Sequence, residues 1–150
     1  MTLPTDDSQT AAASLEAAIN DALNQHSRGN LVQAEKQYRA VLVKAPKHAV
    51  ALHYLGVIAL QTNNADQAIE LISQSILQAP DYADAYSNLA NAYQAKGRFK
   101  DAAESLEKTL ELTAAATSPN PEIRANLGNA YAQLSNFQSA AVNYQRAIAI

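Results

Sequence analysis

Residues 49–82 read AVALHYLGVIALQTNNADQAIELISQSILQAPDY, and this stretch decides the fold. In its first half, apolar residues follow the i, i+3, i+4, i+7 spacing of one helix face, and its second half contains another helical face. Asn63 and Asn64 lie between the halves, and Asn tolerates the left-handed conformation that ends a helix. Because Pro80 blocks continuation of the second helix, the stretch predicts a helical hairpin. The two faces consist of Leu52, Leu55, Gly56 and Ala59, and of Ala68, Ile72 and Ile76.

The hairpin repeats along the chain. Ala34, Ala68 and Ala102 are 34 residues apart, and Ala140 follows after 38. So many positions in phase, with one shared shift of four residues, predict a row of stacked hairpins. The other positions in phase are Tyr38, Ile72, Leu106 and Tyr144, then Leu55, Leu89 and Leu127, then Gly56, Ala90 and Gly128, and finally Pro46 and Pro80.

A 34-residue helical hairpin with Leu55-Gly56, Ala68 and Pro80 at these positions resembles the tetratricopeptide repeat (TPR) family. The resemblance implies an all-α fold, a right-handed solenoid of about four helix-turn-helix repeats with eight helices. We expect a flexible N-terminal lead over residues 1–14 and a TPR domain over residues 15–150. Its repeats are expected at about 15–48, 49–82, 83–120 and 121–150, the last of them incomplete.

The first unit fits the pattern least well. Its first helix is expected over residues 15–27, where Asp21 and Gln25 occupy positions that should be apolar. A register in which Ile19 and Leu23 face the core is the alternative.

The third and fourth units also depart from the pattern. Ala114 stands where the third unit should have proline, so we expect its second helix to continue over Thr113 to Thr117. The fourth unit stops at Ile150 inside its second helix. We therefore expect the chain to be the N-terminal arm of a larger protein, or to need a partner at this end.

Composition limits the possible functions. The 32 Ala residues against 4 Gly and 5 Pro favour helices, and the absence of Cys excludes disulfides and thiolate sites. A net charge of −3 with scattered basic residues does not favour nucleic acid or an anionic membrane. No run approaches the roughly 20 apolar residues of a membrane span, and residues 1–10 lack the basic residue of a secretory signal. We expect a cytoplasmic protein.

The sequence contains no catalytic motif. His26, His48 and His53 form no HExxH arrangement and have no thiolate companions, which disfavours a metal site. The glycines occur singly, so no phosphate-binding loop is expected. We predict a binding protein that is not an enzyme and has no cofactor.

The first helices of stacked hairpins line the concave side, so their outward residues are the candidate peptide-binding surface. The net charge of this surface is expected to be zero or slightly negative. The candidates are His53 and Val57 in the second unit, Asp84, Ser87, Asn88, Asn91 and Gln94 in the third, and Glu122, Asn126 and Asn129 in the fourth.

Asn recurs in phase on this surface. Asn20, Asn88 and Asn126 are equivalent, and Asn91 and Asn129 lie one helical turn further along. An amide carries both a donor and an acceptor, so a ladder of Asn can hold the backbone of an extended peptide. The pattern resembles the TPR arm of O-linked N-acetylglucosamine transferases, which implies this mode of binding. Two alternatives stay open, in which the amides are simply solvated or bond between helices.

The sequence bears on two further binding modes. The TPR clamp for acidic chaperone tails is disfavoured, because Glu122 and Asn126 stand where basic residues are required. An apolar stripe of Val50, Val57 and Leu60 is expected on the inner side of the second unit, and Ile19 and Leu23 can extend it. It can receive an apolar side chain of a bound peptide, unless the first unit packs over it.

The sequence thus predicts a protein–protein interaction module that binds a polypeptide segment in a concave groove. One alternative is a scaffold whose repeats stack end to end, with self-association through the C-terminal repeat. Another is the substrate-recruiting arm of a glycosyltransferase or sulfotransferase whose catalytic domain is not in this chain.

Overall fold

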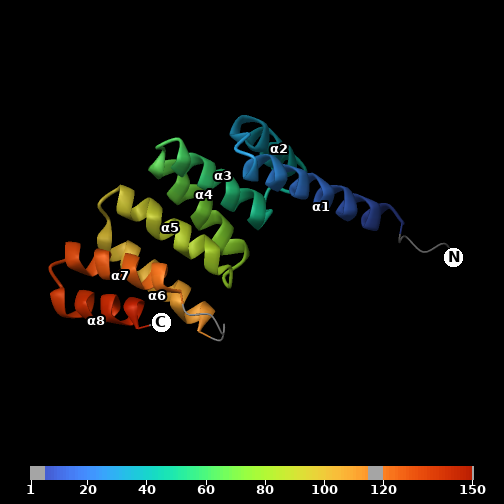
Figure 1. The fold of residues 1–150 in the computed structure, drawn as a ribbon. Helices are drawn as coiled ribbons and strands as arrows, with labels where there is room; N and C mark the ends of the chain where they lie inside the picture. The colour runs from blue at the N-terminus through green and yellow to red at the C-terminus, as the bar shows by residue number, and fades with distance from the viewer. Residues whose placement is uncertain (1–5, 115–119, 150) are drawn as a thin grey trace.

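The structure, a computed structural model, describes residues 6–114 and 120–149, with side chains from residue 9 onward. Over these residues all regular structure is α-helical, and eight helices form four successive antiparallel hairpins (Figure 1). The helices are α1 (Asp6–Ser27), α2 (Leu31–Lys44), α3 (Ala49–Gln61), α4 (Ala65–Gln78), α5 (Ala83–Ala95), α6 (Phe99–Thr113), α7 (Pro121–Gln133) and α8 (Phe137–Ile148).

The helix α1 begins earlier than the repeat pattern predicts. It starts at Asp6 instead of Leu15, so the expected flexible lead over residues 1–14 is wrong for residues 6–14. The run from Ala11 to Ala13 explains the difference, because Ala has the highest intrinsic helix propensity. Local propensity extends this helix beyond the repeat, whereas residues 1–5 lie outside the described part of the chain.

The turn inside every hairpin has the same backbone geometry. Gly29, Asn63, Gly97 and Ser135 occupy one column of the repeat, and their φ angles are 79°, 60°, 69° and 58°. This left-handed conformation has no steric penalty for Gly and a modest one for Asn or Ser. The predicted turn at Asn63 is therefore confirmed, and the other three hairpins turn at the equivalent residue.

Small residues allow the two helices of a hairpin to approach closely. A Cβ on Gly56 would overlap Cγ1 of Ile72, and a Cβ on Gly128 would lie 2.7 Å from Cε1 of Tyr144. The recurrence of small residues at these positions of the repeat is thus a packing requirement. The alanines at the facing column are also buried, namely Ala34, Ala68, Ala102 and Ala140.

The apolar core lies between each hairpin and the first helix of the next. Tyr38, Ile72 and Leu106, one column of the repeat, are completely buried in three successive clusters. Full burial of such a side chain contributes roughly 1.5–3 kcal/mol. In the first unit Ile19 is buried and Leu23 packs against the same cluster, so the alternative register of α1 is the one adopted.

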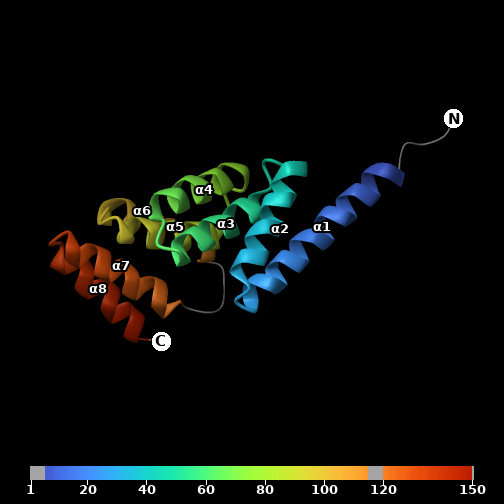
Figure 2. The same cartoon turned by 90° about the horizontal axis from the view of Figure 1, so that it is seen from above.

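The hairpins stack along an arc. Figure 2 shows α4 and α6 on its outer side and α5 on its inner side. The first helices α3 and α5 contact each other directly, whereas hollows open between α4 and α6 and between α6 and α8. Because neighbours are closer on the side of the first helices, these helices line the concave side of the solenoid.

The third hairpin ends close to the position set by the repeat. The helix α6 stops at Thr113, and Ala114 lies in a turn, so the predicted continuation of the helix is wrong at Ala114. The rest of the predicted continuation falls outside the described residues. The next helix begins at Pro121, which needs no N–H partner in the first turn, and Asn120 accepts a bond from the Ile123 amide at 3.2 Å.

Candidate peptide-binding surface

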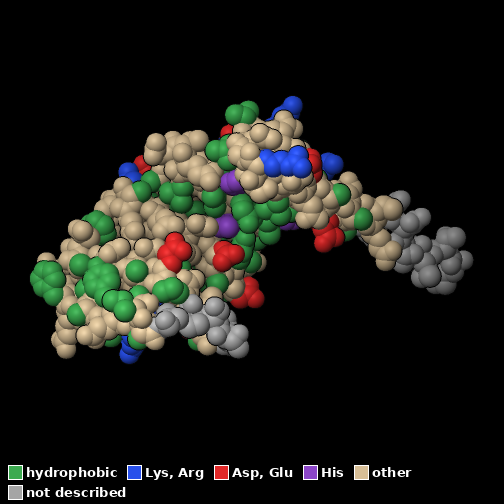
Figure 3. Space-filling view, in the orientation of Figure 1, with side chains coloured by type: hydrophobic (Ala, Val, Ile, Leu, Met, Phe, Trp, Pro, Cys, Tyr) green, Lys and Arg blue, Asp and Glu red, His purple; other side chains and the backbone are tan. Residues whose placement is uncertain are grey.

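The inner side of α5 and α7 exposes a polar strip. Asp84 and Asn91 on α5 are exposed, and so are Glu122 and Asn129 at the equivalent positions of α7. In Figure 3, acidic side chains lie near the middle of the face shown, and Lys and Arg side chains lie toward its margins. The half-buried residues that flank the strip are Val57, Ser87, Asn88, Gln94 and Asn126.

The structure removes His53 from this surface. The sequence analysis places His53 among the peptide-binding residues, but only 2% of it is exposed. Its Nδ1 lies 2.9 Å from Oη of Tyr82, and its Nε2 lies 2.9 Å from Nδ2 of Asn88. With the Asn88 amide donating to Nε2, the neutral ring donates from Nδ1 to the Tyr82 hydroxyl. His53 therefore links α3 to α5 from within the core.

Burial also sets the protonation of this ring. Desolvation lowers the pKa of His53 to about 4, although the negative charge of Asp84 opposes the shift. At neutral pH the ring is therefore uncharged, which suits its buried position. The same burial raises the pKa of Tyr82 well above its ordinary value.

His53 belongs to a row of rings that crosses the first three hairpins. Tyr54 stacks on Tyr38 with ring centroids 5.7 Å apart, and it meets His26 and His53 edge to face at 5.5 and 4.8 Å. His53 meets Tyr82 in turn at 4.7 Å. The half-buried or buried aromatic rings thus connect units one, two and three.

The repeated Asn residues have different partners. Asn88 is bonded to His53, and Asn129 accepts a bond of 2.7 Å from the Tyr144 hydroxyl. The amides of Asn91 and Asn126 have no hydrogen-bond partner among the described residues. Gln94 donates to the backbone carbonyl of Asn126 at 3.5 Å, which ties α5 to α7. One of the alternatives raised by the sequence, interhelical bonding, thus holds for Asn88.

An apolar pocket of about 540 Å³ lies between α1 and the start of α3. Leu23 and Val50 line it, together with Ile19 and Leu15. The predicted inner stripe is therefore partly packed against the first unit and partly open as this pocket.

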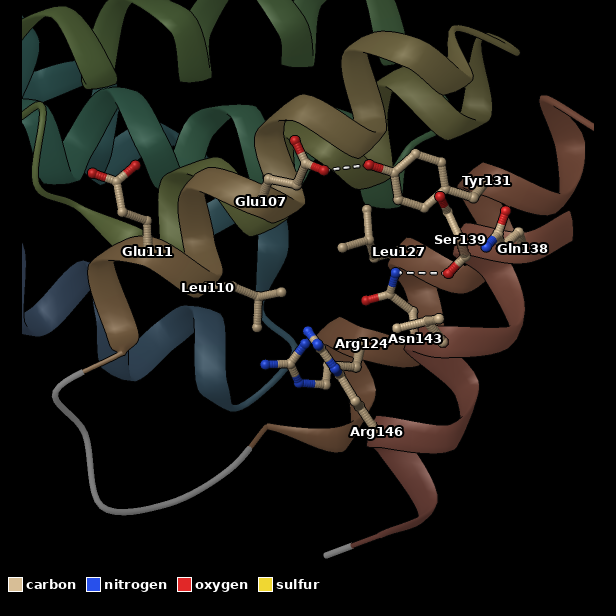
Figure 4. Close-up of a pocket in the computed structure, with 11 residues that line it drawn as sticks. Glu107, Leu110, Glu111, Arg124, Leu127, Tyr131, Gln138, Ser139, Asn143 and Arg146 are labelled. Carbon is tan, nitrogen blue, oxygen red and sulfur yellow. Dashed lines mark hydrogen bonds between the residues drawn. The ribbon is translucent and has the colours of Figure 1, made fainter. Parts of the chain in front are cut away.

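The outer side of the arc contains two hollows that the sequence analysis missed. The α4–α6 groove, of about 420 Å³, lies between α4 and α6 over Leu89 of α5. The α6–α8 groove, of about 540 Å³, lies between α6 and α8 over Leu127 of α7 (Figure 4). Leu89 and Leu127 are equivalent in the repeat, so the grooves are too.

The residues that the structure describes contain no group of three or more His, Asp or Glu side chains placed to hold a metal ion. Over the same residues, no helix combines the length and apolar character needed to cross a bilayer.

Comparison with known families agrees with the hairpin geometry. The sequence model of the tetratricopeptide repeat matches residues 47–115 and 81–150. The chain belongs to the TPR family. TPR arrays are protein–protein interaction modules that use extended surfaces of the solenoid.

One curated relative of this TPR chain is an enzyme. The UDP-N-acetylglucosamine–peptide N-acetylglucosaminyltransferase of Caenorhabditis elegans is 36% identical over 81 residues. These residues make up 54% of this chain and 7% of the transferase. The chain therefore spans only a small part of the relative's length.

Solved structures with the same fold include those of MamA. One crystal structure of MamA has a TM-score of 0.80 and 21% identity, covering 90% of the TPR chain and 77% of MamA. MamA 41-end from Desulfovibrio magneticus RS-1 has a TM-score of 0.78 and 19% identity, with coverage of 90% and 74%. At these identities the likeness shows a shared fold alone.

Proposed function

We propose that the chain holds an extended polypeptide segment along the inner side of the arc, across α3, α5 and α7. The observation that supports this most directly is the pair of amides of Asn91 and Asn126, which have no hydrogen-bond partner among the described residues. They lie on neighbouring first helices, and each can donate to and accept from a peptide backbone. Asn88 and Asn129 serve chiefly to fix the surface, because each already bonds within the protein.

The charge and the apolar pocket of the same surface limit the kinds of peptide that it can bind. Asp84 and Glu122 are exposed on the strip and favour a segment with basic side chains. The pocket between α1 and α3 accepts one apolar side chain at the end of the strip beyond α3. The proposed ligand is therefore an extended segment with an apolar residue followed by basic residues.

The proposed place of this module is the arm of a larger protein that presents polypeptide to another domain. The similarity to part of a peptide N-acetylglucosaminyltransferase supports this role, since the acceptor of that enzyme is a peptide. A transferase arm and a free-standing adaptor would use the same inner surface.

The test uses a fluorescein-labelled synthetic peptide with one Leu followed by alternating Lys and Ala, measured by fluorescence polarisation. Replacing Asn91 and Asn126 together with Ala should weaken binding at least about tenfold, because two amide bonds to the backbone are lost. Gln33→Ala, an exposed amide on α2, is the matched control and should leave the affinity unchanged. Equal affinity of the double Asn variant and the control would exclude the amide ladder.

A second candidate function, self-assembly as a scaffold, is favoured by one observation. Ile76 and Leu110 pack against the hairpin that follows each of them, whereas their counterpart Ile148 is 82% exposed. Phe137 on the same helix is 70% exposed. An apolar face of this kind commonly marks an association surface.

A further inference from the structure

The two outer grooves share a shape but differ in charge. The position of Arg124 in the α6–α8 groove corresponds to Tyr86 in the α4–α6 groove. The position of Arg146 corresponds to Lys108, whose ammonium group is bonded to Glu111 at 2.9 Å. Two guanidinium groups are therefore particular to the α6–α8 groove.

Neither of these guanidinium groups forms an ion pair with a described residue. In the described part of the chain, the side chains of Arg124 and Arg146 have no ion pair and no hydrogen bond. By contrast, Arg39 and Arg98 are paired with Glu35 and Asp101. Two unpaired Arg side chains that line one groove can together hold an anionic group, because each presents several donors in a fixed plane.

The rest of the groove provides an apolar floor. Figure 4 shows Arg124 and Arg146 at one end, Tyr131 and Gln138 toward the other, and Leu110 and Leu127 between them. A ligand that reaches the guanidinium groups therefore also covers apolar side chains.

We propose that the α6–α8 groove binds a polypeptide segment with a carboxylate side chain flanked by apolar residues. The carboxylate lies between Arg124 and Arg146, and the apolar residues cover Leu110 and Leu127. Charge complementarity at the two guanidinium groups selects the acidic residue. This surface is separate from the inner strip of the proposed function.

The acidic residues of the same groove argue for a carboxylate over a phosphate or a polyanion. Glu107 and Glu111 line the groove and balance the charge of the two Arg residues. Glu107 accepts a bond from the Tyr131 hydroxyl, and Glu111 accepts one from Lys108, so both are held in place. A singly charged group fits this balance, whereas a phosphate brings about two negative charges close to the same carboxylates.

A further hairpin stacked on α8 would not occupy the α6–α8 groove. The α4–α6 groove stays open although a complete hairpin, α7 with α8, follows it. By equivalence, a hairpin stacked on α8 would leave the α6–α8 groove open as well. The surface is therefore available for a separate ligand.

The test uses fluorescein-labelled, end-blocked hexapeptides in which Leu alternates with Asp, Asn, Lys or phosphoserine. In fluorescence polarisation the Asp peptide should bind, and R124Q/R146Q should weaken it at least about tenfold. The double variant K96Q/R98Q removes the same charge from exposed positions outside the groove and should leave the affinity unchanged. R124K/R146K keeps the charge but loses the planar fork, so it should restore binding only in part.

Amide chemical shifts locate the bound Asp peptide and separate the two surfaces. The changes should fall on α6, α7 and α8 and persist in the Asn91 and Asn126 double variant. Shift changes confined to the inner side would contradict peptide binding in the α6–α8 groove and would leave the inner-surface proposal intact. Equal binding of the Asn and Asp peptides, equal loss in K96Q/R98Q, or tighter binding of the phosphoserine peptide would each overturn the carboxylate site.

Discussion

Gly56 of α3 faces Ile72 of α4 so closely that a methyl group on Gly56 would overlap the Ile72 side chain. Ile72 is completely buried. The carbonyl oxygen of Ala68 lies 3.3 Å from the same methyl position. This contact sets the distance between the two helices of the second hairpin.

Gly56→Ala should therefore lower the free energy of unfolding by roughly 1–3 kcal/mol, because overpacking outweighs the gain in helix propensity. Urea denaturation followed by circular dichroism measures the change. Gln33→Ala, at an exposed helical position, should shift the same quantity by less than about 0.5 kcal/mol. A Gly56→Ala protein as stable as the original would show that the hairpin opens freely.

Asn88→Ala should destabilise the protein by about 1–3 kcal/mol, because it leaves Nε2 of the buried His53 without a partner. Asn126 occupies the equivalent position on α7 and its amide has no partner among the described residues. Asn126→Ala should therefore change the unfolding free energy by less than about 0.5 kcal/mol. Similar losses in both variants would mean that the His53 bond contributes nothing measurable.

Stability should fall in mild acid as His53 becomes protonated in the unfolded chain. Its pKa is about 4 in the folded state and 6.5 as the ordinary value, so between these limits the unfolded state binds more protons. The contribution is fully present above pH 6.5 and is lost as the pH falls through this window, by at most on the order of 3 kcal/mol. Urea denaturation at several pH values should show a shallower slope in His53→Gln, and an unchanged slope would contradict the assignment.

The exposed face of α8 should associate at high protein concentration. Ile148 and Phe137 are exposed, whereas the residues equivalent to Ile148 in earlier units are covered by the next hairpin. Sedimentation velocity should show a concentration-dependent increase in mass, and the double substitution of Ile148 and Phe137 with Ser should abolish it. Val32→Ser and Val43→Ser, made together at exposed positions on α2, provide the control.

The sequence by itself determined the hairpins and their order. The apolar residues recur with helical spacing, and the turn residues Gly29, Asn63, Gly97 and Ser135 recur at one position, so residues within one repeat specify its two helices and its turn. The length of α1 was missed because the repeat pattern does not register the helix propensity of the Ala run before it.

Tertiary structure decided which members of a repeated column are free to bind. Asn88 and Asn126 are equivalent in sequence, but Asn88 bonds to His53 on the preceding first helix. The residue equivalent to His53 on the helix before Asn126 is the shorter Ser87. The partner of Asn88 comes from another hairpin, so a pattern within one hairpin does not predict this bond. The outer grooves have the same origin, since they exist only because stacking brings the first helices together and separates the second helices. The periodic sequence determines which side chains lie on each face of a hairpin. The contacts between hairpins determine which of these side chains remain exposed.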